Sequence, residues 1–157
     1  MRDDTAARSA KGPMTILLTA DHVRSIEASA RETYPEECCG ILIGVWGEPK
    51  RVLEVRRTPN VAASDRGQRY VIDPTELVAA SAPTGDPERE IIGFYHSHPD
   101  SPSRPSEVDR GRATWPGHSY VIVAVLGGVP HDITSWQMDG ATGFVQAEPL
   151  QVIAPSD

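Results

Sequence analysis

Three apolar segments constrain the fold more than any other feature of the sequence. They are CGILIGVW at 39–46, EIIGFYHSH at 90–98 and SYVIVAVL at 119–126. Short runs that are rich in β-branched and aromatic residues and bounded by turn residues are typical of buried strands. We therefore expect one central sheet with helices packed against it.

Shorter patterns supply the other elements. Thr19 can cap a helix that runs to about Tyr34, and Pro35 marks its end. Asp73-Pro74 can open a second helix, and SEVDRGRA at 106–113 is typical of a third. Further strands are expected at 16–18, 52–57, 69–73, 132–138 and 144–148. Because turns that contain glycine join several strands, we expect an α+β fold with a mixed, mostly antiparallel sheet flanked by helices.

Length and composition are those of an ordinary globular protein. The 157 residues suit a single domain, which we place at 14–157 after a polar, disordered tail at 1–13. The formal charge of −7 argues against nucleic acid and against anionic membrane surfaces as partners. Because the sequence has no apolar signal-peptide core and no long apolar span, we expect a cytoplasmic protein.

The strand at 90–98 ends on two histidines and predicts a metal site. Side chains at i and i+2 of a strand share a face, so His96 and His98 project together. If Ser106 starts a helix, Asp109 lies in its first turn and can turn back toward the histidines. Two imidazoles and one carboxylate leave a fourth tetrahedral position for water, which is the layout of a catalytic zinc site.

Each part of this pattern also has a structural explanation. An isolated His-x-His pair is more often a polar surface feature than a metal site. Ser106 and Asp109 also fit a capping box, which would hold the aspartate in place. Cys38 and Cys39, the only cysteines, would point to opposite faces of a strand, so they cannot both join the histidines on one ion. Their adjacency also disfavours a disulfide between them.

A hydrolytic zinc site also needs a base, and several glutamates are candidates by position. Glu36 and Glu37 come just before the strand at 39–46, while Glu90 and Glu107 lie near the histidines in the sequence. The spacing alone leaves this choice open.

The joint pattern resembles the JAMM (MPN+) metalloprotease family. His96-Ser97-His98-Pro99, followed by Ser106 and Asp109, matches the family's H-S/T-H-P, serine, x-x-aspartate signature. Glu37-Cys38-Cys39-Gly40 is similar to the E-x-C-G segment of that family, and the stretch at 59–77 is similar to its small bacterial branch. The resemblance extends over about residues 15–147.

This resemblance implies a single JAMM/MPN-like domain that binds one Zn²⁺ with a water and hydrolyses peptide or isopeptide bonds. By carry-over, His96, His98 and Asp109 would ligate the zinc. Glu37 would be the base that takes a proton from the water and passes it to the leaving amine. Ser106 would hydrogen-bond the oxyanion of the tetrahedral intermediate.

The resemblance also implies a substrate class. The compact chain has little spare length for the insertions with which deubiquitinating relatives grip ubiquitin chains, and it is more similar to bacterial enzymes that trim ubiquitin-like sulfur-carrier proteins. The expected reaction is cleavage beside the C-terminal Gly-Gly tail of such a carrier, releasing cysteine or a short extension. We expect the tail to add to a sheet edge next to the metal. A deubiquitinase-like isopeptidase that acts on other conjugates is the alternative.

Two further alternatives belong to other classes of protein. One is a non-catalytic MPN-type interaction module. The other is a cupin-like or facial-triad iron oxygenase, which also uses two histidines and a carboxylate. Cupins usually follow the His-x-His pair with a nearby glutamate and a later histidine in an all-β barrel, whereas here a proline-rich loop and an expected helix follow. His22, His118 and His131 lack comparable spacing and are expected to be structural or surface residues.

Overall fold

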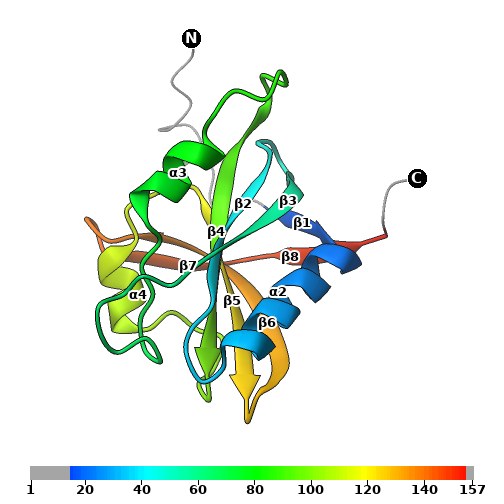
Figure 1. The fold of residues 1–157 in the computed structure, drawn as a ribbon. Coiled ribbons are helices and arrows are strands. Elements are labelled where there is room, and N and C mark those ends of the chain that lie inside the picture. The colour runs from blue at the N-terminus through cyan, green and yellow to red at the C-terminus, as the bar shows by residue number, and fades with distance from the viewer. Residues whose placement is uncertain (1–14, 155–157) are drawn as a thin grey trace.

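A computed structural model describes residues 15–154, so the tail expected at 1–13 lies outside the described residues. The strands form one eight-stranded sheet in the order β7-β6-β5-β4-β2-β3-β1-β8 (Figure 1). In chain order, the elements are β1 Ile16–Thr19, α2 Ala20–Thr33, β2 Cys39–Val45, β3 Lys50–Thr58, α3 Pro74–Ala80, β4 Arg89–Pro99, α4 Glu107–Arg112, β5 Ser119–Leu126, β6 Val129–Asp139, β7 Phe144–Glu148 and β8 Leu150–Ile153.

The sheet is mixed, and the expectation of a mostly antiparallel sheet was wrong. β4 runs parallel to β5, and β1 runs parallel to both β3 and β8. The other four neighbouring pairs are antiparallel. The parallel β4–β5 pair arises because the long connection containing α4 returns the chain to the end of the sheet where β4 began, as parallel neighbours require.

Two individual strands also differ from expectation. The expected strand at 69–73 does not form, because its backbone bonds to a neighbouring loop instead of the sheet. The Val71 amide donates to the Asn60 side chain at 3.1 Å, and the Val71 carbonyl accepts from the Val61 amide at 3.0 Å. β8, which was not expected, pairs in parallel with β1 along its whole length.

The strand order requires the sheet to curl strongly. β7 and β8 stand at opposite ends of the order, yet only Pro149 separates them in the chain. Figure 1 shows them following one another in nearly the same direction. The two ends of the sheet are therefore brought close together, and the sheet is nearly barrel-like.

A buried ion pair links β7, at one end of the sheet, to β3, which lies toward the other end. Glu148, at the end of β7, lies 2.9 Å from the Lys50 ammonium at the start of β3, and both side chains are fully buried. The same carboxylate accepts hydrogen bonds from three polar side chains of β5 and β6, which are Ser119, Ser135 and Gln137. Because the contacts of this carboxylate come from β3, β5 and β6, they tie these three strands to β7.

Replacing Glu148 with alanine is expected to destabilise the protein by about 3 to 5 kcal/mol, because the Lys50 charge then stays in the interior without its carboxylate. Urea unfolding measures the change. Glu88, which is exposed, provides the matched control, and Glu88→Ala should change stability by less than about 0.5 kcal/mol. Equal stability of the two variants would mean that the buried pair does not hold the curl.

The sheet is covered on both faces, as the apolar segments predicted. On one face, Ile26 and Ala30 of α2 belong to a hydrophobic cluster with Leu42 of β2. On the other face, Ile41 and Ile43 belong to a second cluster, which includes Ala80 of α3. Successive residues of β2 thus enter opposite clusters, which explains why the segment is apolar throughout.

The first helix begins where the sequence predicted. The Thr19 hydroxyl accepts from the His22 amide at 3.2 Å, and the His22 ring accepts from the Thr19 amide at 3.1 Å, so the two residues form a capping box. The expectation that His22 is structural is therefore confirmed. Among residues 15–154, no helix is long and apolar enough to cross a membrane.

Candidate metal centre

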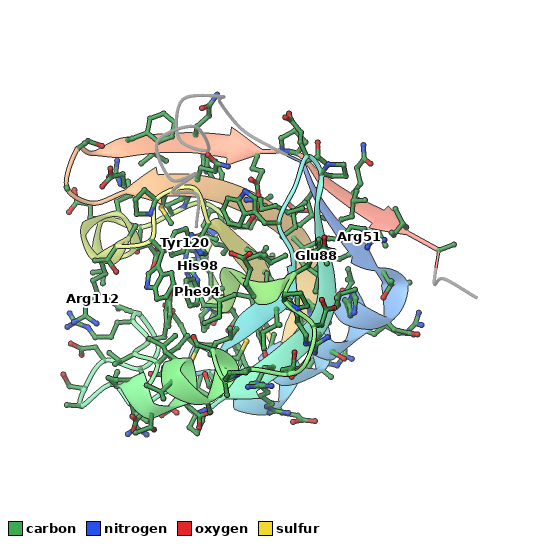
Figure 2. All side chains as sticks on the ribbon, turned by 90° about the horizontal axis from the view of Figure 1, so that it is seen from above. Arg51, Glu88, Phe94, His98, Arg112 and Tyr120 are labelled. Atoms are coloured by element: carbon green, nitrogen blue, oxygen red, sulfur yellow. The ribbon has the colours of Figure 1, made fainter. Side chains whose placement is uncertain are left out.

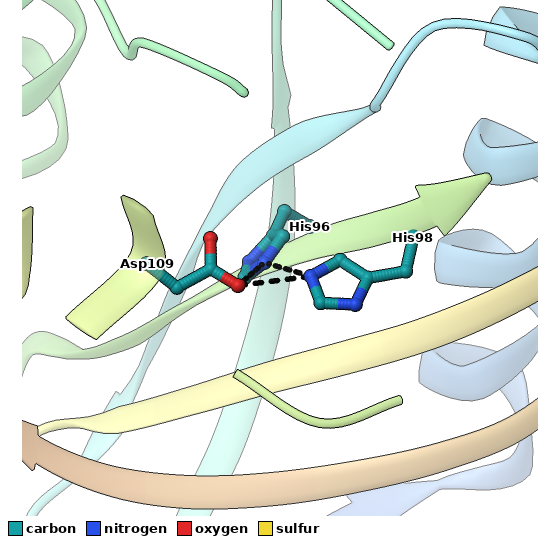
Figure 3. Close-up of side chains that lie close together, drawn as sticks. All are labelled: His96, His98 and Asp109. Carbon is teal, nitrogen blue, oxygen red and sulfur yellow. Dashed lines mark hydrogen bonds and ion pairs between the residues drawn. The ribbon is translucent and has the colours of Figure 1, made fainter. Parts of the chain in front are cut away.

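The two predicted histidines lie together near the end of β4. Their Nε2 atoms are 3.1 Å apart, and Figure 3 shows both rings converging on one point. β4 is paired on both sides, with β2 and with β5, so the backbone that carries the rings is firmly held. Both side chains are buried, and Figure 2 shows His98 in the interior of the molecule.

The start of α4 brings Asp109 to the same point. Ser106 is the N-cap of this helix, and its hydroxyl accepts from the Asp109 amide at 3.1 Å. Asp109 Oδ2 accepts from the Ser106 amide at 2.9 Å and lies 2.9 Å from His98 Nε2 and 3.2 Å from His96 Nε2 (Figure 3). The predicted capping box therefore forms, and it aims the carboxylate at the histidines.

The three donor atoms suit a small divalent metal. Ligands about 2.0 Å from a tetrahedral zinc are about 3.3 Å from one another, close to the separations of these donors. His98 Nδ1 lies 2.7 Å from the Pro102 carbonyl, which can only accept, so Nδ1 carries the proton. Nε2 is therefore the nitrogen that would coordinate a metal, in place of the proton that it can share with Asp109. Among the described residues, His96, His98 and Asp109 are the group that could hold a metal.

Electrostatics favours the ligand forms of two of these side chains. Burial acts to raise the pKa of Asp109, but His96, His98 and the Ser106 amide outweigh it and hold this pKa well below its usual range. Burial lowers the pKa of His96, against the opposing effect of Asp109. At neutral pH the carboxylate is thus ionised and the His96 imidazole neutral, which are the forms that bind a metal.

Glu37 lies beside this centre because of the register between β2 and β4. Cys39 is opposite His96 in that antiparallel pair. The same register continues before the strand, because the Ser97 amide donates to the Cys38 carbonyl at 3.2 Å. One step further along this register places Glu37 opposite His98.

The Glu37 carboxyl is buried and faces a cavity. It is 3% exposed, and its Oε1 has no hydrogen-bond partner within residues 15–154. Glu37, His98 and Ser106 line the same cavity of about 670 Å³. Burial raises the pKa of Glu37 to about 8, the charge of Asp109 adds to this rise, and His98 opposes it. A buried carboxyl that faces a cavity without a partner suits a group that exchanges protons with a molecule bound there.

The raised pKa of Glu37 predicts a pH-dependent stability of the metal-free protein. Ionisation of Glu37 is penalised in the folded state, so this penalty is absent below pH 4.5 and grows until the pH passes about 8. In chelator-treated protein, Glu37→Gln should therefore be more stable than wild type by up to about 3 kcal/mol at pH 7 and by little at pH 4.5. Urea unfolding at both values measures this. The neighbouring exposed variant Glu36→Gln should show no such trend, and a pH-independent difference for Glu37→Gln would contradict the prediction.

The other candidate glutamates lie less favourably for a base. Glu90 is near the opposite end of β4, six residues and thus about 20 Å from His96. Glu36 and Glu107 are exposed, although Glu107 also borders the cavity. Of the four glutamates, Glu37 combines burial with a place beside the histidines.

The strand order places the metal centre away from the two outer strands of the sheet. The sheet ends on β7 and β8, and neither carries a residue of the metal centre, which lies on a central strand and on α4. The expected addition of an extended tail to a sheet edge beside the metal stays a prediction.

Tyr70 also contacts the centre, a role that the spacing of residues did not indicate. Its ring stacks on His96 with the ring centroids 4.5 Å apart and an angle of 25° between the planes. His96 Nδ1 has no hydrogen-bond partner within residues 15–154, in contrast to His98 Nδ1. The stack thus takes the place of the hydrogen bond that usually orients a ligating imidazole.

Removal of the Tyr70 ring should therefore weaken metal binding. Tyr70→Leu is expected to lower zinc affinity about 10- to 100-fold, as for the loss of other groups that orient metal ligands. Tyr70→Phe keeps the stack and should bind zinc like wild type. Competition with a chromophoric chelator measures both affinities. Equal affinities of the leucine and phenylalanine variants would exclude an orienting role for the ring.

Comparison with known proteins agrees with this geometry. The sequence profile of the Prok-JAB family, described as prokaryotic homologs of the JAB domain, matches residues 19–139. That range includes all five predicted site residues, which are Glu37, His96, His98, Ser106 and Asp109. This chain belongs to the Prok-JAB family. The predicted membership of the JAMM/MPN group is thereby confirmed.

Individual relatives cover most of this Prok-JAB chain. A desampylase from Haloferax volcanii is 40% identical over 109 residues, which are 67% of this chain and 77% of the relative. A CysO-cysteine peptidase from Mycobacterium tuberculosis is 31% identical over 144 residues, which are 91% of this chain and 95% of the relative. The structure of a JAB1/MPN domain protein from Archaeoglobus fulgidus has a TM-score of 0.56 at 20% identity and covers 90% of this chain and 99% of its own, which shows the JAB/MPN fold.

Proposed function

We propose that this Prok-JAB protein is a zinc-dependent peptidase that acts on a ubiquitin-like sulfur-carrier protein. It would hydrolyse the bond that follows the C-terminal Gly-Gly tail and release cysteine or a short extension. The observation that carries the proposal is a group of three side chains that could hold a metal, one of which, His98, lines a cavity together with Glu37 and Ser106. The names of the two relatives, a desampylase and a CysO-cysteine peptidase, support the class of substrate.

His96, His98 and Asp109 would hold the metal, since two imidazoles and a carboxylate match the donor set of catalytic zinc sites. Zinc bound there would supply a Lewis acid and lower the pKa of an attached water. Glu37 would act as the proton-transfer group, accepting a proton from the attacking water and donating it to the leaving amine. Burial raises the pKa of Glu37 to about 8, and a divalent cation held beside it would lower this pKa and favour the carboxylate form that accepts a proton.

Ser106 can serve both the fold and the reaction. Its hydroxyl oxygen accepts the Asp109 amide proton as the cap of α4, which leaves its own proton free to donate. That proton would bond to the oxyanion that develops as the peptide carbonyl is attacked. Because the cap holds the hydroxyl on the cavity wall, the donor is in place before the substrate arrives.

The direct test is incubation of the zinc-loaded protein with a panel of ubiquitin-like carriers that bear one or a few residues after Gly-Gly. Intact mass should show loss of the extension at the Gly-Gly junction, with none in the Glu37→Gln variant. The same carriers joined to a lysine side chain test the alternative, an isopeptidase that acts on other conjugates. Binding without any cleavage would indicate an interaction module, and stoichiometric iron with oxygen consumption would indicate an oxygenase.

A further inference from the structure

An arginine lies in the cavity beside the proposed catalytic groups. Arg104 lines the cavity of about 670 Å³ that also contains Glu37, His98 and Ser106. Apart from His98, the other ionisable side chains along its wall are acidic, and they are Glu37, Asp100 and Glu107. Among the described residues that line this cavity, Arg104 is therefore the one with a permanent positive charge.

The backbone on both sides of Arg104 is held in place. The carbonyl of Ser103, a buried residue, accepts from Thr134 Oγ1 at 2.5 Å and from Trp136 Nε1 at 3.1 Å. Two residues after Arg104, Ser106 is bonded into the cap of α4. The side chain of Arg104 is exposed, so it is anchored at its base and free at its tip.

The guanidinium of Arg104 is also available for a ligand. Within residues 15–154 its side chain makes no ion pair and no hydrogen bond. The nearest acidic residue before it on this loop, Asp100, already accepts from the Tyr34 hydroxyl at 2.6 Å and the Gly127 amide at 2.8 Å. A free guanidinium can bind a carboxylate through two hydrogen bonds, because its planar donors match the two carboxylate oxygens.

The chemistry of the leaving group shows which carboxylate would be present. When one amino acid follows the Gly-Gly tail, its free carboxylate carbon is about 2.5 Å from the scissile nitrogen. In an isopeptide conjugate, the leaving nitrogen belongs to a lysine side chain, and the carboxyl group of that lysine is far along the chain and neutral within a peptide bond. A cation in the cavity can therefore distinguish the two kinds of substrate.

We propose that Arg104 binds the free α-carboxylate of the amino acid that leaves the carrier tail. The inference rests on the proposed function and makes it more specific, since it assigns a carboxypeptidase-type preference to the site. In the reaction, water oxygen bonds to the glycine carbonyl carbon and the C–N bond breaks. One water proton passes through Glu37 to the leaving amine, and the amino acid departs with its carboxylate on Arg104.

The experiment compares two carriers that differ only at the last residue. One carries a single amino acid with a free carboxylate after Gly-Gly, and the other carries the same residue as its primary amide. The zinc-loaded wild type should cleave the acid with a kcat/KM about tenfold higher or more, the effect of one charge-assisted contact. In Arg104→Ala this preference should fall to near unity, because cleavage of the acid should slow toward that of the amide. Arg104→Lys should keep part of it, because lysine retains the charge without the planar donors.

The control and the outcomes separate this inference from the proposed function. Arg110→Ala, which changes an exposed arginine of α4 outside the cavity wall, should retain the wild-type preference. Equal cleavage of acid and amide by wild type, or an unchanged preference in Arg104→Ala, overturns the role of Arg104 and leaves the peptidase in place. The role of Arg104 is also overturned if the protein cleaves lysine conjugates but no carrier with a single amino acid after Gly-Gly. If zinc-loaded wild type cleaves no carrier substrate at all, both the inference and the proposed function are refuted.

Discussion

Replacing Glu37 with glutamine is expected to lower kcat for carrier cleavage by about 10²- to 10⁴-fold, the contribution typical of a positioned proton-transfer group. Glutamine has nearly the same shape as glutamate but cannot take a proton from water at neutral pH. The bound zinc should remain, because Glu37 is not one of the three side chains whose donor atoms converge. Loss of activity with full metal content is the signature that separates a base from a ligand.

Two measurements on the same preparation test this expectation. Intact mass over time gives the rate of cleavage, and elemental analysis gives the zinc content per chain. Glu36→Gln, one residue away and exposed, should retain wild-type rate and zinc. Unchanged turnover in Glu37→Gln would remove it as the base and direct attention to Glu107, the other candidate glutamate that borders the cavity.

His96, His98 and Asp109 could be predicted from the sequence because their placement depends on local geometry. The two-residue period of a strand puts the histidines on one face, and a capping box holds the aspartate in the first turn of α4. Both rules act within a few residues, so spacing alone predicted which side chains would meet.

Glu37 could not be selected in this way, because its position depends on a contact between distant segments. The register that pairs Cys39 with His96 brings it to the centre, and nothing in the local sequence encodes that register. The resemblance to a family supplied the choice instead. Tyr70 is a similar case, since its stack on His96 depends on how the segment near Asn60 folds back.

The errors in the predicted fold have the same origin. The apolar strands were predicted from their composition. Whether two neighbouring strands run parallel depends on which end of the sheet the connection between them reaches, and composition does not indicate this. The segment 69–73 has the composition of a strand, yet the Asn60 side chain takes up its backbone hydrogen bond and keeps it out of the sheet. β8 is short and half-exposed, and it becomes a strand because the curl brings it beside β1.

The other large effect is expected at Asp109. Asp109→Ala should lower zinc affinity by more than about 100-fold, because it removes a ligand, whereas removal of a group that only orients a ligand costs up to about 100-fold. Cleavage should be lost together with the metal. His98→Ala should behave likewise, because it removes a second donor atom of the same centre. Chelator competition gives the affinity, and intact mass gives the cleavage rate.

The capping box makes Asp109→Ala alone ambiguous, because Asp109 also accepts from the Ser106 amide. The alanine variant should therefore also lose about 1 kcal/mol of stability, as when other helix caps are removed. Asp109→Asn resolves the two roles. Its side-chain oxygen can still accept from the Ser106 amide, so the helix start and the stability should be retained, whereas a neutral amide is a poor zinc ligand. Stoichiometric, tightly bound zinc in both variants would mean that Asp109 serves the helix and not the metal. Zinc lost from both, with stability retained in the asparagine variant, would assign the carboxylate to the metal.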